Sequence, residues 1–301
     1  MHTGDFYVVD GFLCKYSGTE ANVTIPEDVK EIGWHCFRNC ESIESVYIPA
    51  GVTYVGSGTF ENCKNLKQIT LPDTLTDIAD DTFLGCDSLA NEQGFIIVRD
   101  TVYGYIGAEQ NVVIPAEVKH IGSLSFNRCK NLKTVTIPEG VVSIGEQAFG
   151  DCTSLKSISL PSSLTSIGRY AFKDCCDLEA IMIPHGVTQI GDSAFYGCES
   201  LTTIVIPDGI ATVESYMFSG CKRLSSVTIP DSVTAIGECA FRFCARLDTI
   251  YIPASVTHLG TSLCLFEEGV FDGCDFLTIQ APAGSYAIQY AKENDIPYKE
   301  I

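Results

Sequence analysis

The chain has 301 residues, of which 46% are hydrophobic, and its net charge is −19 from 38 acidic and 19 basic residues. The hydrophobic content excludes an intrinsically disordered chain, and no apolar run reaches the roughly 18 residues that a membrane-spanning helix needs. Because the negative charge repels phosphate groups, nucleic acids and anionic membrane surfaces are poor partners, and direct membrane insertion is not expected.

The first 25 residues predict a β-hairpin. Two short runs of strand-forming residues, at 6–9 and 12–16, flank an Asp10–Gly11 pair that is typical of a tight hairpin turn. We interpret residues 1–25 as an N-terminal cap, because the end of a stack of repeats would otherwise expose apolar side chains. The same residues lack the basic and apolar segments of a secretory signal, which leaves a cytoplasmic location open.

Residues 26–280 consist of about ten copies of a 23-residue unit. Each unit begins with a proline, numbered here as position 0. The units begin at Pro26, Pro49, Pro72, Pro115, Pro138, Pro161, Pro184, Pro207, Pro230 and Pro253. Position 3 is always Val, Leu or Ile, while position 11 is Phe, position 14 is Cys and position 17 is Leu or Ile in nine units. Position 7 is Gly in eight units, with Ala79 and Glu214 as the exceptions. Such a fixed period predicts a solenoid, in which each unit buries its apolar side against its neighbours.

Two short strands are expected in each unit. The end of a unit, such as Ser157–Ser159, alternates outward and inward side chains as a strand does, and Ser143–Ile144 represents a plausible second strand. The proline should end the first strand because it cannot donate to a ladder, and the glycine should allow a corner or a close backbone approach. The Phe of position 11 and the Leu of position 17 are expected to fill the middle of each coil.

A second hairpin-like segment, near residues 91–114, interrupts the repeats. Residues 95–115 echo residues 6–26 at a constant offset of 89. The chain therefore reads as two modules, each a hairpin followed by repeats. We expect the second hairpin to be stacked within the solenoid, and a hinge at this place is the less favoured alternative.

The last unit is irregular and is followed by a C-terminal cap. Cys264 stands where Phe is expected, and the Phe–Asp–Gly–Cys motif arrives seven residues late, ending at Cys274. In residues 281–301, Ser285 and Asn294 are suitable as the N-terminal and C-terminal limits of one short helix. A strand-like segment follows the predicted helix.

The segment from Val141 to Leu155 contains the pattern Ile-Gly-x-x-Ala-Phe-x-x-Cys-x-x-Leu, which resembles the BspA-like leucine-rich repeat. The resemblance covers residues 24–280, and the Ala-Gly-Ser-Tyr segment ending at Tyr286 resembles the C-terminus of that family. It implies a leucine-rich-repeat solenoid, a β-rich α/β horseshoe with short parallel strands and little helix. It further implies a non-enzymatic protein with an adhesive role, secreted or on the surface of a bacterial or protozoan cell.

Ten of the 15 cysteines fall in one column of the repeat. They are Cys40, Cys63, Cys86, Cys129, Cys152, Cys175, Cys198, Cys221, Cys244 and Cys274. Equivalent residues of stacked strands lie about 4.8 Å apart with parallel Cβ vectors, whereas a disulfide needs Cβ atoms that converge to about 3.8 Å. We therefore expect a row of buried free thiols, with Cys176 as a more exposed one.

No catalytic, cofactor or metal site is predicted. His35, Cys36 and Cys40 faintly resemble metal-ligand spacing, but Cys40 belongs to the buried column. The acidic cluster at 77–81 does not have EF-hand spacing, and solvation of the surface explains it better than calcium binding. The spacing of the five histidines does not impose a catalytic pair, so no Ser or Cys is expected beside a His, as nucleophilic catalysis requires.

Position 21 of each unit faces outward from the main strand, and this row provides the candidate binding residues. It is neutral and rich in hydroxyl groups, with tyrosines toward both ends and two apolar side chains between them. The candidates are Tyr47, Thr70, Thr136, Ser159, Met182, Val205, Thr228 and Tyr251. Solenoids commonly bind partners through such extended faces, so we expect a protein-interaction module whose concave face binds a protein, for instance one on a host cell or in its extracellular matrix.

Two other interpretations of this row stay open. Ser and Thr simply suit exposed strand positions, and the chain would then be a structural spacer or an intracellular scaffold without a ligand on this face. The sequence does not indicate an oligomeric state.

Overall fold

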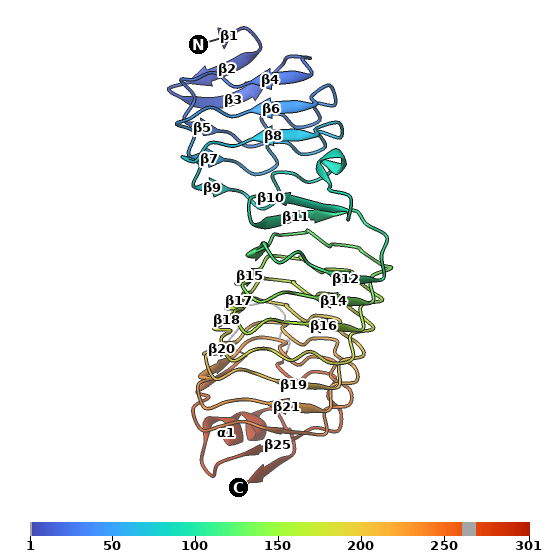
Figure 1. The fold of residues 1–301 in the computed structure, drawn as a ribbon. Coiled ribbons are helices and arrows are strands. Elements are labelled where there is room, and N and C mark those ends of the chain that lie inside the picture. Colours follow the sequence, from blue (N-terminus) through green and yellow to red (C-terminus); the bar gives the residue numbers. More distant parts are fainter. Residues whose placement is uncertain (1, 261–268) are drawn as a thin grey trace. The chain divides into compact units, whose positions relative to one another are not determined.

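The computed structural model describes residues 2–260 and 269–301, so the predicted replacement of Phe by Cys264 lies outside the described residues. The chain divides into two compact units. Unit 1 comprises residues 1–107 with 122–125, and unit 2 comprises residues 108–121 with 126–301. Both are built from coils whose short strands pair with those of the coils before and after them (Figure 1).

Unit 1 begins with the predicted hairpin. Strands β2 (Phe6–Val9) and β3 (Phe12–Tyr16) are antiparallel, and the short β1 (His2–Thr3) pairs with β2. Asp10 and Gly11 have φ angles of 50° and 80°, as the two central residues of a type I′ turn require. The hairpin prediction is confirmed, and β3 continues into the first coil because it pairs in parallel with β5.

The coils of unit 1 carry two parallel ladders. The shorter strands are β5 (Glu31–Ile32), β7 (Tyr54–Val55) and β9 (Asp77–Ile78). The longer strands are β4 (Asn22–Thr24), β6 (Ser45–Tyr47) and β8 (Gln68–Thr70). Partners in both ladders are one 23-residue unit apart, as in the Ile32–Val55 and Val46–Ile69 pairs. The two strands expected in each unit are therefore confirmed here.

A second hairpin closes unit 1. It consists of β10 (Phe95–Val98) and β11 (Thr101–Tyr105), and the short 3-10 helix η1 (Asp87–Leu89) precedes it. Its register shifts between Ile96 and Ile97, as that of the first hairpin shifts between Tyr7 and Val8. The internal duplication thus extends to the backbone irregularity. How this hairpin stacks on the repeats that follow stays a prediction.

Unit 2 contains the same two kinds of strand. The shorter ones are β13 (His120–Ile121), β15 (Ser143–Ile144), β17 (Ser166–Ile167), β18 (Gln189–Ile190), β20 (Thr212–Val213), β22 (Ala235–Ile236) and β24 (His258–Leu259). The longer ones are β12 (Asn111–Val113), β14 (Thr134–Thr136), β16 (Ser157–Ser159), β19 (Thr203–Val205), β21 (Ser226–Thr228), β23 (Thr249–Tyr251) and β25 (Thr278–Ala281). Among the described residues, the shorter ladder is interrupted between β18 and β20. The longer one continues after β16 only through an isolated Ser157–Ala180 bridge, and it is interrupted again between β21 and β23.

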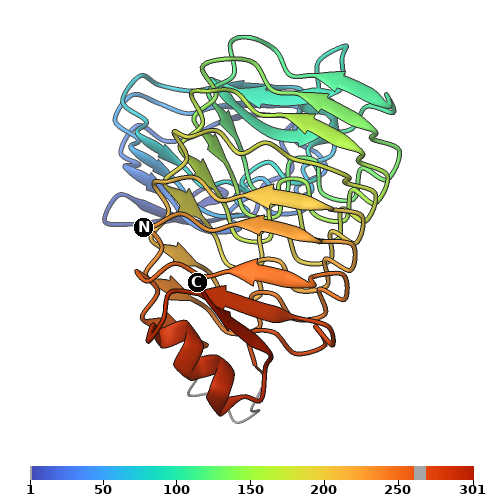
Figure 2. The ribbon, with the colours of Figure 1, turned by 90° about the horizontal axis from the view of Figure 1, so that it is seen from below.

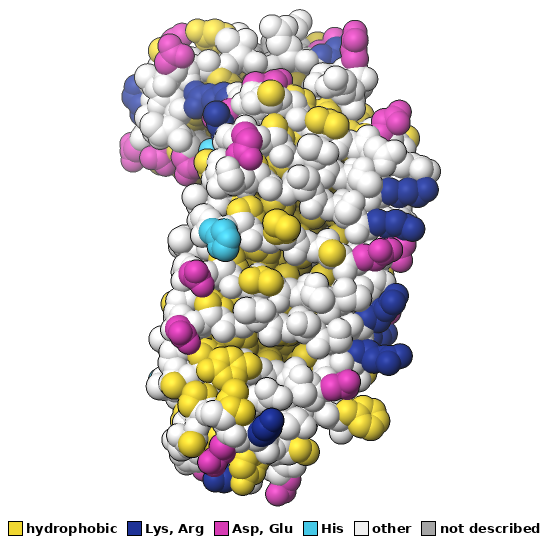
Figure 3. All heavy atoms as spheres, turned by 60° about the horizontal axis from the view of Figure 1, so that its bottom comes forward, with side chains coloured by type: hydrophobic (Ala, Val, Ile, Leu, Met, Phe, Trp, Pro, Cys, Tyr) yellow, Lys and Arg dark blue, Asp and Glu magenta, His cyan; other side chains and the backbone are white. Residues whose placement is uncertain are grey.

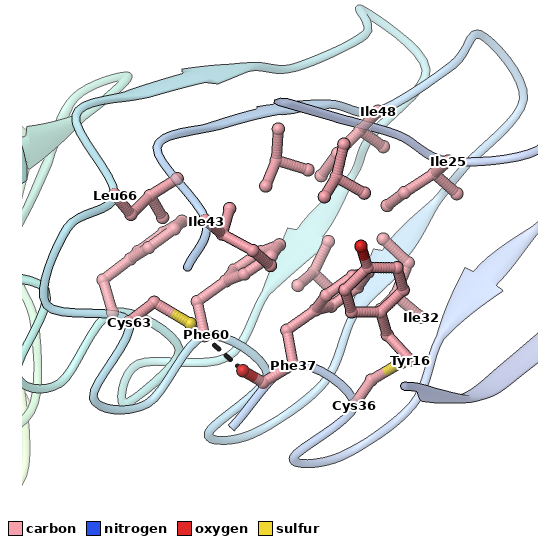
Figure 4. Packing of buried hydrophobic residues seen from close by; sticks show 14 of the residues in the cluster. Tyr16, Ile25, Ile32, Cys36, Phe37, Ile43, Ile48, Phe60, Cys63 and Leu66 are labelled. Atoms are coloured by element: carbon pink, nitrogen blue, oxygen red, sulfur yellow. Dashed lines mark hydrogen bonds between the residues drawn. The ribbon is translucent and has the colours of Figure 1, made fainter. Parts of the chain in front are cut away.

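The core of both units is a column of aromatic rings. All nine Phe side chains of position 11 are less than 2% exposed, as the sequence predicts. In unit 2 successive rings stack with centroids 4.9–5.7 Å apart from Phe126 to Phe271. In unit 1 the hairpin extends the column, because the ring of Tyr16 lies 4.9 Å from that of Phe37 (Figure 4) and the ring of Phe6 lies 5.1 Å beyond Tyr16.

The cysteine column ties each coil to the one before it. The thiol of Cys63 donates to the carbonyl oxygen of Phe37 at 3.1 Å (Figure 4), and the thiol of Cys152 donates to that of Phe126 at 3.0 Å. The fourteen described cysteines are all free. The expectation of buried free thiols is therefore confirmed for eight of the ten column cysteines, while Cys40 and Cys129 are only partly buried. The sequence reasoning missed that thiols of this column also act as hydrogen-bond donors.

Left-handed backbone conformations form two corners of the coil, at positions 9 and 13. At position 13 the residues with positive φ are mostly Asn, Asp or Gly, such as Asn62 (59°) and Gly197 (71°), which adopt this conformation at little cost. At position 9, in contrast, Tyr170 and Tyr216 both have φ of 56°. Bulky side chains rarely adopt this conformation, so the surrounding coil must hold them there.

A helix and a strand cap the C-terminal end of unit 2. Helix α1 (Tyr286–Glu293) packs beside β25, and β26 (Tyr298–Glu300) pairs with β25 in parallel (Figure 2). The helix limits at Ser285 and Asn294 are confirmed, although the Ser285 hydroxyl makes no capping hydrogen bond. The ring of Tyr290 meets Phe271 edge-on at 6.3 Å, so the cap helix contributes the last ring of the aromatic column of unit 2.

Candidate interaction surface

The longer strands present the predicted binding row to solvent. In β16 the side chains of Ser157 and Ser159 are exposed while Ile158 between them is buried, and most of the other longer strands repeat this alternation. All eight predicted residues are exposed. The alternation of the sequence is therefore sufficient to place this row on the surface.

The two units divide the predicted residues into two groups. In unit 1, Tyr47 of β6 and Thr70 of β8 are register partners and lie side by side. The other six predicted residues belong to unit 2. Each group is a separate surface, and only the group in unit 2 contains the apolar pair Met182 and Val205.

The row in unit 2 runs across successive coils. Thr136 and Ser159 are register partners, as are Val205 and Thr228, while Tyr251 lies on the adjacent β23 and Met182 lies outside any regular strand. Met182 is 86% exposed and Val205 is 58% exposed. Large apolar side chains with this exposure on adjacent coils form a small hydrophobic patch.

The sequence reasoning missed one apolar member of this row. Val113 of β12 is the register partner of Thr136 and is 69% exposed. Position 21 is defined by counting forward from the proline of a regular unit. Val113 lies in the irregular segment before Pro115, so this count does not reach it. Counting back would have found it, because Tyr47, Val113 and Val205 all stand two residues before a proline. We call the full set the outward row; it consists of Val113, Thr136, Ser159, Met182, Val205, Thr228 and Tyr251.

The two edges beside the outward row differ in charge. Because the longer strands are parallel, all their N-terminal ends lie along one edge and all their C-terminal ends along the other. Lys133 and Lys156 directly precede β14 and β16, and Arg223 and Arg246 line a cavity of about 570 Å³ at the same edge. The exposed carboxylates of Glu179 and Asp248 lie among these four basic side chains. The opposite edge carries the exposed carboxylates of Glu139, Asp208 and Asp231. Figure 3 shows hydrophobic side chains between these edges, with basic side chains gathered along one of them.

One prediction about histidines is wrong. His120 and Ser143 are register partners, and the Nδ1 atom of His120 lies 2.8 Å from the Oγ atom of Ser143. The ladder pairs them because each stands at position 5 of its own unit, His120 in the unit that begins at Pro115 and Ser143 in the next one. Among the described contacts, no third group orients the imidazole ring as a nucleophile–base pair requires.

The other polar candidates have structural partners. The pKa of the Cys36 thiol is raised to about 12 by burial, which opposes the thiolate that a metal ligand needs. The Nδ1 atom of His35 lies 3.5 Å from Glu61. Asp81 accepts hydrogen bonds from the Ser57 hydroxyl at 2.7 Å and the Gly58 amide at 3.2 Å. In the part of the chain that the structure describes, no three His, Cys, Asp or Glu side chains gather as metal ligands.

Cys176 is only half-buried, in contrast to the thiols of the column. Its thiol donates to the carbonyl oxygen of Asp174 at 3.5 Å. Partial burial and the carboxylates of Glu199 and Asp174 raise its pKa. The thiol is accessible, but its environment does not activate it.

The stacked coils, with parallel strands around a buried column of Leu, Ile and Phe, define a leucine-rich repeat solenoid. A model of the BspA type leucine rich repeat region matches residues 13–93, 97–198 and 165–291. The chain belongs to this family. A search of curated proteins gives no match.

Solved structures of bacterial leucine-rich repeat proteins are similar to the chain. A leucine rich repeat protein of T. pallidum is 26% identical, with a TM-score of 0.54, and the match covers 70% of this chain and 97% of that one. A leucine-rich repeat protein from Eubacterium ventriosum is 23% identical, with a TM-score of 0.51, and the match covers 87% of this chain and 88% of that one. These likenesses support the solenoid fold. No helix among the described residues has both the length and the apolar character that crossing a membrane requires.

Proposed function

We propose that the chain is a non-enzymatic protein-interaction module that binds a partner protein through the outward row of unit 2. The observation that carries this proposal is the exposure of Met182, 86%, and Val205, 58%, on adjacent coils. Exposed apolar side chains gain about 25 cal/mol for each Å² that a partner covers. The hydroxyl groups of Thr136, Ser159 and Thr228 around them provide hydrogen bonds at a polar rim.

The charged edges supply orientation. A partner that lies across the longer strands meets Lys133, Lys156, Arg223 and Arg246 on one side and carboxylates on the other. Complementary charges on the partner fix its direction and accelerate the encounter, while the central apolar contacts hold the complex. The ligand that fits is therefore a protein segment with an apolar centre and opposite charges at its two ends.

A role in adhesion, on the surface of a cell or after secretion, is part of the proposal. Its support is the family resemblance, whose members include surface proteins with adhesive roles. The partner would then be an extracellular or cell-surface protein of a host. A spacer without a ligand on this face is the competing function, and the experiment below separates the two.

The test compares wild type with Met182→Asp/Val205→Asp in the capture of purified extracellular matrix proteins. A matched control, Thr165→Asp/Thr257→Asp, adds the same charge at exposed positions outside the longer strands. We expect the patch variant to lose at least about tenfold in affinity for the captured protein, because buried charges oppose association, while the control retains it. Equal binding by all three proteins would eliminate the outward row, and binding of none of the matrix proteins would favour the spacer.

A further inference from the structure

The glycine of position 7 allows adjacent coils of unit 2 to approach closely. A Cβ atom built on Gly191 would lie 2.5 Å from the amide nitrogen of Arg169 in the preceding coil, and one on Gly237 would lie 2.6 Å from that of Ser215. Real Cβ atoms do not come this close to a backbone. The approach permits a hydrogen bond from each of these glycines to the preceding coil, such as Gly237 N–H to the carbonyl oxygen of Val213 at 2.7 Å.

Glu214 replaces the glycine of position 7 in the unit that begins at Pro207. The ladder of shorter strands is interrupted at this unit, and we call the gap the open junction. Strands β18 and β20 do not pair with each other. Each pairs on its other side, β18 with β17 and β20 with β22. The equivalent hydrogen bond, from Glu214 N–H to the carbonyl oxygen of Ile190, does not form among the described residues. Because a Cβ atom on the equivalent Gly191 or Gly237 would collide with the backbone of the preceding coil, the side chain of Glu214 accounts for the missing bond.

The other exception at position 7 is Ala79. It shows that the space between two coils decides whether their shorter strands can pair when glycine is replaced. Its N–H still donates to the carbonyl oxygen of Val55 at 3.0 Å, and β7 and β9 stay paired. In unit 1 the glycine of the coil before it is less crowded by backbone, since a Cβ on Gly56 would lie 3.0 Å from the nitrogen of Trp34. A methyl group fits such a junction, whereas a glutamate side chain at the tighter junction of unit 2 does not.

The open junction contributes to a cavity of about 550 Å³. Its walls include Ser166, Gln189, Gly191, Asp192, Thr212 and Glu214. At an intact junction Thr234 N–H donates to the carbonyl oxygen of Ala211 at 2.8 Å, but the corresponding bond from Ala211 to Thr188 is absent from the described contacts. The β18 wall therefore offers free carbonyl oxygens at Thr188 and Ile190, and the β20 wall offers free amides at Ala211 and Glu214.

The cavity is acidic at one end. The half-buried carboxylate of Glu214 has no hydrogen bond or ion pair among the described residues, and burial together with the charge of Asp192 raises its pKa. Asp192 itself accepts a hydrogen bond from Arg169 at 3.2 Å. One carboxylate in the cavity thus lacks a cation.

We propose that the open junction between β18 and β20 binds an extended segment of a partner protein that carries a Lys or Arg beside Glu214. Free amides together with free carbonyl oxygens are what a peptide backbone satisfies, since each of its residues has one donor and one acceptor. The carboxylate selects the positive side chain. The site lies on the shorter ladder, so it does not depend on the outward row of the longer strands.

The test uses a blocked heptapeptide of alternating valine and lysine, and a matched peptide in which glutamate replaces lysine. Binding is measured by calorimetry to wild type, Glu214→Gln, Glu214→Gly and the control Glu238→Gln, which removes the same charge one coil further on. Hydrogen exchange of the Ala211 and Glu214 amides, or of residue 214 in the variants, reports directly on the junction.

Wild type should bind the lysine peptide at least about tenfold more tightly than the glutamate peptide, and binding should slow exchange of both amides. Glu214→Gln should abolish this preference, whereas Glu238→Gln should keep it. Glu214→Gly should close the ladder, slow exchange without peptide and reduce binding at least about tenfold. Unchanged binding in Glu214→Gly, protection confined to the longer strands, or no binding by wild type would each overturn the proposal. None of these results bears on the outward row, which the Met182→Asp/Val205→Asp variant tests separately.

Discussion

Two sides of the same two coils are held together differently: the corner side, near positions 9 to 13, and the strand side, which carries the short parallel strands. Between the coils that begin at Pro184 and Pro207, Phe195 N–H donates to the carbonyl oxygen of Met217 at 3.0 Å, and the rings of Phe195 and Phe218 stack at 5.6 Å. On the other side of these coils, β18 and β20 do not pair with each other, although the longer strands β19 and β21 of the same coils do. The corners and the longer strands are therefore sufficient to keep the coils in register without the shorter ones.

This difference separates scaffold from surface. Phenylalanine rings and thiol hydrogen bonds recur at almost every junction, which leaves the strands free to vary. Both proposed binding regions, the outward row and the open junction, lie on the strand side. Substitutions can therefore alter binding there without removing what holds the stack together.

Loss of a ring should have the largest effect. Phe149→Ala and Phe195→Ala should each lower the free energy of unfolding by about 3–5 kcal/mol, because each leaves a cavity in the core. Phe195→Ala should also split urea unfolding into two transitions, since its coil is joined to the next by paired longer strands but by no paired shorter ones. Phe276→Ala, whose ring is 76% exposed, serves as the control and should change stability by less than about 0.5 kcal/mol. A single transition in Phe195→Ala would show that the strand side contributes more than its hydrogen bonds indicate.

Loss of a column thiol should have an intermediate effect. The Cys221 thiol donates to the carbonyl oxygen of Phe195 at 3.3 Å, at the open junction. Cys221→Ala should lower the free energy of unfolding by about 1–2 kcal/mol, because it leaves a buried carbonyl oxygen without a donor and removes a packed atom. The matched change Cys176→Ala, at a half-buried thiol, should be nearly neutral in the same urea titration. Equal effects of the two changes would contradict the role of the column in joining coils.

The pH dependence from Glu214 should be the smallest effect. Its pKa in the fold is raised above the ordinary value of 4.5 by burial and by Asp192, so the folded protein favours the protonated form. The stability it contributes is present below about pH 4.5 and is lost as pH rises through the raised pKa. Because the group is only half-buried and solvent screens its charge, the difference between wild type and Glu214→Gln should change by only about 0.5 kcal/mol across this window. A pH-independent difference in urea midpoints would contradict an unpaired carboxylate here.

Much of this architecture could be predicted from the sequence because it repeats. Phe149 and Leu155 recur at fixed spacing, and only a buried position in every coil explains that. The Asp10–Gly11 turn and the limits of α1 depend on local chemistry, which a single segment expresses. The outward row followed from simple alternation, and only Val113, outside the regular count, was missed.

The remaining features depend on distances between coils, which no single repeat encodes. Ala79 and Glu214 break the same glycine column, yet only Glu214 stands at an open junction, because the space available differs between the two coils. The contact between His120 and Ser143 likewise arises from register across a ladder. The cysteine column was recognised as buried, but its hydrogen bonds to the preceding Phe required the backbone geometry.

The open junction also has a mechanical consequence. A force that pulls the coils of unit 2 apart along their stack must break the hydrogen bonds of both ladders and of the corners. Where β18 and β20 do not pair, the shorter ladder opposes no such force, and the load falls on the corner bonds, the ring of Phe195 and the pairing of β19 with β21. The two coils at this junction should therefore separate at a lower force than coils that both ladders join.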